Sequence, residues 1–251
     1  HDDIRVRFDY PASMWVQYEG RGMQESYKAT QGERNIIEWT WANPKPVKLT
    51  RRDYSVFDPE KEVGYAFSTF RSHAEISAAY GLRATPKAAV TERIAKLAGE
   101  IVKGKAGKKE QARALYEWVA TNITYGGNCI GVGAVVPRDV DLVLDNKMGD
   151  CKDHATLLQA LLTATGIKST QALVNAGSSY ILQRIPMVFG VNHVINYLPE
   201  LDLFVDSTSD STPFGMLPFS DQDKPVLLVE GHRDGIKTPV PPASQNRQTV
   251  R

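Results

Sequence analysis

The segment Gly149-Asp150-Cys151-Lys152-Asp153-His154 places a cysteine at the start of a strongly apolar helical stretch. Asp150 is a good N-cap residue, so Cys151 falls at the first helical position. There the unpaired backbone N–H groups and the positive end of the helix dipole favour a thiolate over a thiol. The same N–H groups can stabilise an oxyanion formed from an attacked carbonyl. Gly149 is expected to adopt a positive φ and so to allow a tight turn before the sulfur. A nucleophile and a buried structural cysteine both fit this position.

A thiolate nucleophile needs a base, and the chain has five histidines. His193 lies in one alternating stretch, and a second such stretch leads to Asp206 after the Pro199–Glu200 pair. A hairpin centred on that pair places His193 opposite Asp206, with Cβ atoms about 4.5–5.5 Å apart. The carboxylate can then orient the imidazole as in a catalytic triad, although an ordinary cross-strand pair has the same spacing. His154 lies on the same helix face as Cys151 and is the alternative base.

Other residues with reactive side chains have simpler interpretations. Cys129 is predicted to be structural, and the alternatives are a second thiol near the site or a disulfide with Cys151. The acidic residues match no calcium-loop spacing, so we expect helix capping and solvated positions for Asp150, Asp153, Asp202 and Asp210. No metal or cofactor is predicted.

The N-terminal half of the chain changes its periodicity once. Residues 1 to about 70 alternate apolar and polar side chains between turn-forming clusters, which predicts an antiparallel sheet or part of a sandwich. From about residue 72 the period is 3.6. Helices are predicted from Thr85-Pro86 to about Gly104 and from Lys108 to about Asn122, with a short helical piece at 140–144.

The C-terminal half begins with the apolar helix 151–165, which we expect to be central because most of its circumference is apolar. Strands follow at 170–174, 191–198 and 201–207, and residues 218–251 with their prolines are expected to form an extended arm or linker. The expected domains are therefore 1–71, rich in β-strands and whole or partial, a catalytic domain at 72–217, and the arm at 218–251.

Composition excludes several classes of protein. The 251 residues are 42% hydrophobic and 24% charged, which is ordinary for a soluble fold. The 30 basic and 29 acidic residues leave a formal charge of +1, which argues against a nucleic-acid partner. No run approaches the roughly 20 apolar residues of a transmembrane helix. Because the chain begins His1-Asp2-Asp3 without methionine, we expect a processed form or part of a longer polypeptide.

The cysteine, histidine and aspartate blocks together resemble the transglutaminase-like (Cys-His-Asp) superfamily. Its signature is a cysteine in a G-x-C context at the start of a central helix, then a histidine and an aspartate on successive strands. The matching segments are Gly149–Asp153 with the leucine pairs that follow it, Asn192-His193, and Phe204–Thr208. The resemblance covers roughly residues 85–215. The N-terminal part, through residues 66–70 and 74–75, resembles the β-rich domain that precedes this core in large, usually exported bacterial proteins.

This resemblance implies an α+β fold: a transglutaminase-like (papain-like) core in which the cysteine-bearing helix packs on an antiparallel sheet, preceded by the sandwich-like β-rich domain. It implies that Cys151 is the nucleophile, His193 the general base and Asp206 its orienter, and that Tyr125 lines the site. A periplasmic or otherwise extracytoplasmic location is expected by the same resemblance.

The function expected from these residues is acyl transfer from an amide through a Cys151 thioester. Hydrolysis of a protein or peptide substrate, by a cysteine protease or amidase, is favoured. The alternatives are transamidation, in which an amine replaces water, and a non-catalytic binding module that retains the fold.

Overall fold

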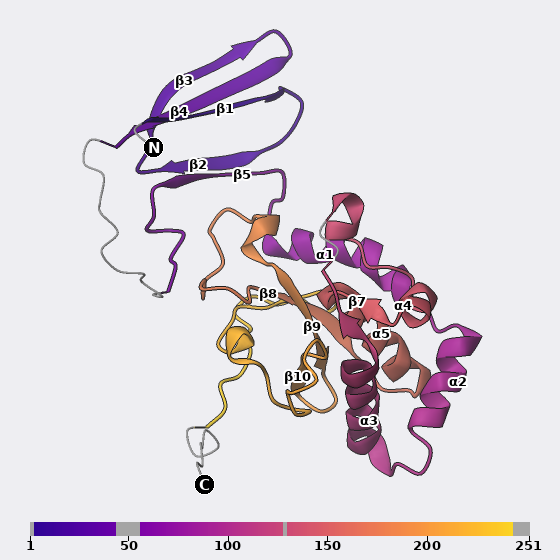
Figure 1. Cartoon of the computed structure of the whole chain (residues 1–251). Helices are drawn as coiled ribbons and strands as arrows, with labels where there is room; N and C mark the ends of the chain where they lie inside the picture. Colours follow the sequence, from indigo (N-terminus) through magenta and orange to yellow (C-terminus); the bar gives the residue numbers. More distant parts are fainter. Residues whose placement is uncertain (1–2, 44–55, 128–129, 243–251) are drawn as a thin grey trace. The chain divides into compact units, whose positions relative to one another are not determined.

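The computed structural model describes residues 3–43, 56–127 and 130–242, and its chain divides into two compact units (Figure 1). Unit 1 comprises residues up to Ile76 together with Ser178–Gly190, and unit 2 comprises Ser77–Gly177 and the chain from Val191 onward. No helix in the described ranges has the length and apolarity needed to cross a bilayer.

Unit 1 is rich in β-strands, as predicted. Its strands are β1 (Asp3–Pro11), β2 (Gln17–Arg21), β3 (Gln24–Gln31), β4 (Arg34–Ala42) and β5 (Gly64–Ser68). One antiparallel sheet has the order β1-β4-β3, and β2 pairs with β5. Aromatic side chains from both pairings pack together: the ring centroid of Phe8 lies 5.8 Å from that of Trp39 and 4.2 Å from that of Phe67. This aromatic cluster is the core of the unit.

The α-helices of the described residues lie between residues 73 and 164, together with two 3₁₀ turns. They are α1 (His73–Ala84), the 3₁₀ turn η1 (Thr85–Ala88), α2 (Glu92–Ile101), α3 (Gly107–Asn122), the turn η2 (Gly131–Ala134), α4 (Val140–Asn146) and α5 (Cys151–Ala164). The helix predicted to start at Thr85 is wrong at its N-terminus. Thr85-Pro86 opens only a single turn, and Ala89 is extended (φ −64°, ψ 137°). Helix α2 starts later, where the Thr91 side chain accepts a hydrogen bond from the Ile94 N–H at 3.2 Å.

The second sheet carries the C-terminal half of unit 2. Its strands are β8 (Thr170–Val174), β9 (His193–Leu198), β10 (Leu203–Val205) and β11 (Leu227–Leu228), in the antiparallel order β10-β9-β8-β11. The short strands β6 (Thr124–Tyr125) and β7 (Met148–Gly149) pair in parallel, and the turns η3 (Val188–Gly190) and η4 (Phe219–Asp221) complete the elements. Figure 1 shows α5 beside β8 and β9.

Helix α5 is the centre of unit 2, as its apolar circumference predicted. Its leucines are fully buried among side chains of α2, α3, α4, β9 and β10. Two polar contacts fix its position on the sheet: Asn196 on β9 donates from Nδ2 to the Ala155 carbonyl at 2.9 Å, and Gln171 on β8 donates to Thr156 Oγ1 at 3.1 Å. Because these contacts are buried, the helix cannot slide along the sheet without leaving polar groups unpaired.

The hairpin of β9 and β10 differs from the prediction in its register. Leu198 pairs with Leu203 and Tyr197 with Phe204, so the hairpin is centred one residue further along the chain than the Pro199–Glu200 bond. The loop before Leu203 includes Asp202 in the left-handed conformation (φ 48°). The partner of each residue moves by two positions, and side chains alternate with a period of two. The error therefore leaves positions 193 and 206 on the same side of the hairpin.

The expected arm differs from the structure over residues 218–242. This stretch contains η4 and β11, and β11 pairs with β8 through Leu227↔Leu173 and Leu228↔Ala172. The cause is a short apolar run, because Val226, Leu227 and Leu228 are all buried in the core of unit 2. A domain boundary before residue 218 would remove a strand from its sheet.

Candidate active site

Cys151 lies at the first position of α5, as predicted, and its thiol is free and half-buried. Asp150 is the N-cap: its carboxylate accepts the Asp153 N–H, and the Asp153 carboxylate accepts the Asp150 N–H at 3.1 Å. This reciprocal capping box fixes the first turn of the helix. The sulfur is therefore held beside the unpaired N–H groups of a helix N-terminus. Cys129, the other cysteine, lies outside the described residues.

Gly149 is required for a different reason from the one predicted, because its φ is not positive. A Cβ atom at this position would lie 2.7 Å from the Asp153 Cβ and 3.5 Å from the His154 Cδ2. The first of these separations is shorter than any real Cβ contact. Glycine therefore lets the chain that precedes Cys151 approach the first turn of its own helix.

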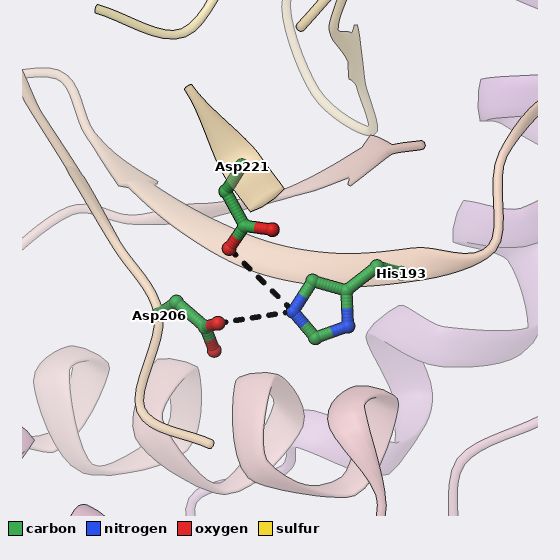
Figure 2. A group of neighbouring side chains, drawn as sticks. All are labelled: His193, Asp206 and Asp221. Atoms are coloured by element: carbon green, nitrogen blue, oxygen red, sulfur yellow. Dashed lines mark hydrogen bonds and ion pairs between the residues drawn. The ribbon is translucent and has the colours of Figure 1, made fainter. Parts of the chain in front are cut away.

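His193 and Asp206 are in contact, although neither strand register nor strand ends are as predicted. The imidazole Nε2 lies 3.0 Å from Asp206 Oδ2 (Figure 2). The His193 side chain is 12% exposed and that of Asp206 is 3% exposed. Nδ1 points away from the carboxylates in Figure 2, and Cys151 is, with Asp206, one of the two groups that raise the pKa of the imidazole. His193 and Asp206 are therefore in contact, and Cys151 acts electrostatically on the same imidazole.

These contacts change the protonation of His193. Burial lowers the pKa of its imidazole, but the hydrogen bonds and charges of Asp206 and Cys151 outweigh burial and raise the pKa to about 10. For Asp206, burial raises the pKa, and the hydrogen bond and positive charge of His193 reverse this, so the carboxyl pKa is below its usual value. An imidazolium ion paired with a carboxylate is therefore the favoured state at neutral pH.

The Asp206 carboxylate is held from its other side. Its Oδ1 accepts hydrogen bonds from the Thr208 N–H at 3.0 Å and from the Thr208 hydroxyl at 2.8 Å. The buried Tyr116 hydroxyl on α3 lies 2.9 Å from the Asp206 carbonyl oxygen and 2.8 Å from that of Thr212. Oδ2 is thus aimed at the imidazole. The contact between Asp206 and Thr208 joins residues two apart in the sequence. The contact of Tyr116 with Asp206 joins residues 90 apart, so the sequence alone does not indicate it.

A second acidic side chain, which the sequence did not predict, faces the same imidazole. Asp221 Oδ2 lies 3.8 Å from His193 Nε2, and its side chain is 1% exposed (Figure 2). One ligand atom from each of His193, Asp206 and Asp221 lies within 4.8 Å of the others, so these are residues that could contact one divalent cation. Such an ion would replace the hydrogen bond between His193 and Asp206.

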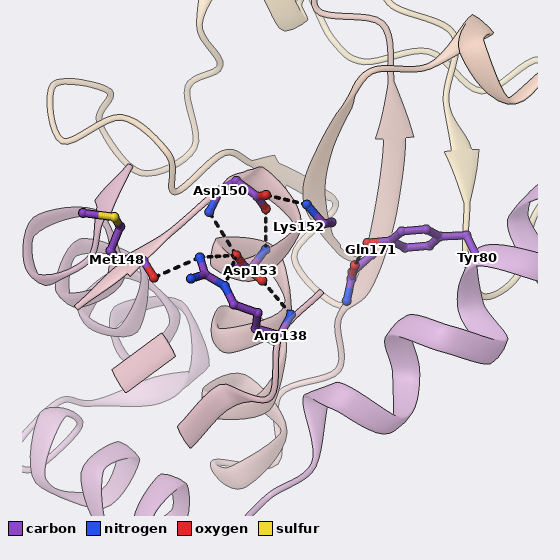
Figure 3. Close-up of polar contacts among 7 residues, drawn as sticks. All are labelled: Tyr80, Arg138, Met148, Asp150, Lys152, Asp153 and Gln171. Carbon is purple, nitrogen blue, oxygen red and sulfur yellow. Dashed lines mark hydrogen bonds and ion pairs between the residues drawn. The ribbon is translucent and has the colours of Figure 1, made fainter. Parts of the chain in front are cut away.

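Ion pairs surround the first turn of α5 (Figure 3). Arg138 donates from Nη2 at 2.7 Å and from Nε at 3.0 Å to Asp153 Oδ2, and its Nη2 also lies 3.2 Å from the Met148 carbonyl. Lys152 pairs with Asp150. Both carboxylates are buried in the capping box, so the expected capping is confirmed for them, and Asp202 and Asp210 are exposed, as expected of solvated positions. The pairing of each acid with a base leaves this turn without net side-chain charge.

His154 makes a buried contact with the backbone after Asp206. It is 1% exposed, and its Nδ1 donates to the Ser207 carbonyl at 2.8 Å. Burial lowers the pKa of its imidazole against the raising effect of that hydrogen bond. A neutral His154 therefore ties the helix of Cys151 to the residue that follows Asp206.

Tyr125 lies beside the segment that leads to Cys151. Strand β6 pairs Tyr125 with Gly149, and the following N–H, that of Gly126, donates to the Gly149 carbonyl at 2.8 Å. The Tyr125 ring is about half exposed and its centroid lies 6.0 Å from that of His154. A hollow of about 890 Å³ lies near Gln159 and Thr163, toward the C-terminal end of α5. Cys151, His193 and Asp206 do not line it.

Part of this chain is similar to proteins of known family or structure. Residues 95–178 match the family model described as the transglutaminase-like superfamily. No curated protein matches the chain in sequence. A solved structure described as a "putative protease" from Parabacteroides distasonis is similar, with a TM-score of 0.72 and 16% identity over 94% of this chain and 45% of that chain. A "putative cysteine protease" from Cytophaga hutchinsonii gives a TM-score of 0.37 and 11% identity over 83% of this chain and 67% of that chain.

The structure from Parabacteroides distasonis shows the fold alone, and this chain spans less than half of its length. That likeness confirms the predicted α+β architecture with its β-rich N-terminal region. The family match contains Cys151 and ends before His193 and Asp206. The predicted resemblance is thus confirmed by the match of residues 95–178 to the model of the transglutaminase-like superfamily.

Proposed function

We propose that this protein is a thiol-dependent acyl-transfer enzyme that hydrolyses a peptide or amide bond. The superfamily match and the fold of the protease-like neighbours support a thiol-dependent enzyme family. One observation supports the finer proposal: His193 Nε2 lies 3.0 Å from Asp206 Oδ2 in a buried site, and Cys151 acts with Asp206 to raise the pKa of the same imidazole. A binding module has no physical need for this buried, charged arrangement, which is costly unless every member is paired.

In the proposed reaction the Cys151 sulfur attacks the carbonyl carbon of the amide, and the backbone N–H groups at the start of α5 stabilise the oxyanion. The proton of the thiol resides on His193, at Nδ1, and passes to the amine as the C–N bond breaks. A thioester remains on Cys151. His193 then takes a proton from water, whose oxygen attacks the thioester, and release of the carboxylic acid regenerates the thiol. Asp206 orients the imidazole and stabilises its charge.

Tyr125 is proposed to line the acyl-binding side of the site. Tyr125 pairs with Gly149, which precedes Cys151 by two residues in the sequence, and its ring is about half exposed. An exposed aromatic ring supplies apolar contact area for a peptide without adding a titratable group near neutral pH.

Alkylation of the free thiol by iodoacetamide as a function of pH tests the nucleophile. We expect the wild type to react at Cys151 below pH 7, because His193 stabilises the thiolate, and His193→Ala to lose this reactivity. Cys129→Ala is the matched control, since it removes the other thiol and should leave the low-pH reaction intact. Two thiols with the behaviour of free cysteine would contradict the proposal.

Activity profiling against a peptide library, with wild type and Cys151→Ala in parallel, tests the reaction itself. New peptide termini that require Cys151 support hydrolysis, and adding a primary amine shows whether an amide forms instead. A wild type with a reactive thiol that neither cleaves nor joins any library member would contradict the peptide-bond proposal.

A further inference from the structure

The carboxylate of Asp221 is built into the site by a rigid piece of chain. The Asp221 N–H donates to the Pro218 carbonyl at 2.9 Å, and the Ser220 hydroxyl donates to Asp221 Oδ1 at 3.1 Å. The buried Thr238 hydroxyl donates to the Asp221 carbonyl, and its own N–H donates to the Lys224 carbonyl at 2.9 Å. Hydrogen bonds therefore hold both the backbone and the side chain of Asp221, which fixes the position of its carboxylate.

Asp221 and Asp206 approach one ring nitrogen from two directions. Their Oδ2 atoms lie 3.8 Å and 3.0 Å from His193 Nε2, and Figure 2 shows both carboxylates on the side of the ring opposite to Nδ1. A hydrogen bond from the ring N–H to a single acceptor leaves the ring free to tilt about that bond. A second carboxylate restricts this tilt, because the Nε2–H proton is attracted from both sides.

The charges that face Asp221 explain how a second buried acid is tolerated. His193 and Asp206 face it within the site, and the fully buried Lys224 lies on its own segment. Burial raises the pKa of the Asp221 carboxyl, as does Asp206, against the charge of His193, and the result is about 6. Burial also lowers the pKa of Lys224, against the charge of Asp221. Two cationic groups thus offset the two carboxylates.

We propose that Asp221 is a positioning residue: a second carboxylate that, with Asp206, holds the Nε2 side of His193 and keeps Nδ1 turned toward Cys151. This role rests on the proposed function of the same site. It extends the triad by a residue that comes from the segment after residue 217, which the sequence predicts as an arm.

The test compares Asp221→Asn with Asp223→Asn in the full chain. Asparagine keeps the shape of the side chain and removes its charge. The control removes an exposed carboxylate two residues away, which pairs with Lys237 at 2.9 Å on the surface. The readout is the titration of His193 by NMR in protein with labelled histidines, in buffer with a chelator so that no cation occupies the carboxylates.

We expect Asp221→Asn to lower the midpoint of the His193 titration by about one pH unit or more, because unit charges about 4 Å apart interact strongly in a buried site. Asp223→Asn should leave the midpoint unchanged, and a residue with only a structural role would not move it. Asp221→Ser gives the same test with a smaller side chain if the amide does not fit. A midpoint in either folded Asp221 variant equal to that of wild type would overturn the proposal.

Asp206→Asn supplies the second arm. With Asp221 still present, its His193 midpoint should remain above that of the Asp206→Asn/Asp221→Asn double variant, and equal midpoints would overturn the proposal. The NMR readout does not require catalysis. An inert Cys151 in the wild type would therefore contradict the proposed function, while a shifted His193 in Asp221→Asn would still support the positioning role.

Discussion

Replacement of Gly149 by alanine should destabilise the first turn of α5, because the new methyl group would lie 2.7 Å from the Asp153 Cβ. The Asp153 Cβ belongs to a helical residue whose carboxylate is fixed by the Asp150 N–H and by Arg138, so it cannot move aside at low cost. Overpacking of this kind costs about 1–3 kcal/mol. Loss of the capping box adds about 1 kcal/mol. The expected decrease in the free energy of unfolding is about 2–4 kcal/mol.

Amide hydrogen exchange of α5 is the appropriate assay, because it reports the local stability of this helix in a chain with two units. Gly99→Ala is the matched control: Gly99 lies exposed in α2, and a Cβ there meets no atom within 4 Å. It should be neutral or stabilise by up to about 1 kcal/mol. Alkylation of Cys151 should also slow in Gly149→Ala, since the sulfur moves with the displaced turn. Equal protection of α5 in the two variants would refute the reasoning.

Three further changes have defined outcomes. Thr91→Ala removes the N-cap hydrogen bond to Ile94 and should cost about 1 kcal/mol in urea unfolding without changing Cys151 alkylation; an unchanged stability would contradict the cap. Tyr116→Phe should cost about 1–3 kcal/mol and slow peptide cleavage, because the carbonyl oxygens of Asp206 and Thr212 lose the hydroxyl that they share; full stability would argue against this contact. His193 has a pKa raised from 6.5 to about 10 in the folded state, so its stabilisation is complete below pH 6.5 and is lost as the pH rises toward 10. The unfolding free energy of wild type relative to His193→Gln should therefore decrease across that window, and a constant difference would count against the raised pKa.

Local signals predicted the cysteine side of the site. The start of the helix at Cys151 could be predicted because the cap Asp150, the first helical residue and the apolar run that follows are adjacent in the sequence. Helix α5 accordingly begins at Cys151 as predicted. The reason for Gly149 could not be read in the same way, since it depends on how closely the chain approaches Asp153 rather than on its own φ.

The histidine side was predicted only in part. The alternation of strands placed His193 and Asp206 on one side of a hairpin, but the exact pairing depends on the loop, where Asp202 adopts a positive φ that no local signal required. Asp221 could not be found from its neighbours. It reaches His193 through a turn among prolines, and the strand after it has only two residues, too few for a periodic pattern.

The path of the chain between β8 and β9 has a consequence for biosynthesis. The polypeptide passes from unit 1 to unit 2 after Ile76, returns at Ser178, and leaves again after Gly190. Unit 1 therefore cannot be completed on the ribosome until the 101 residues of unit 2 from Ser77 to Gly177 have been synthesised. Contacts of such high sequence separation are slow to form, so the contact of Glu19 on β2 with Arg184 in this later segment forms after the pairing of the N-terminal strands with one another.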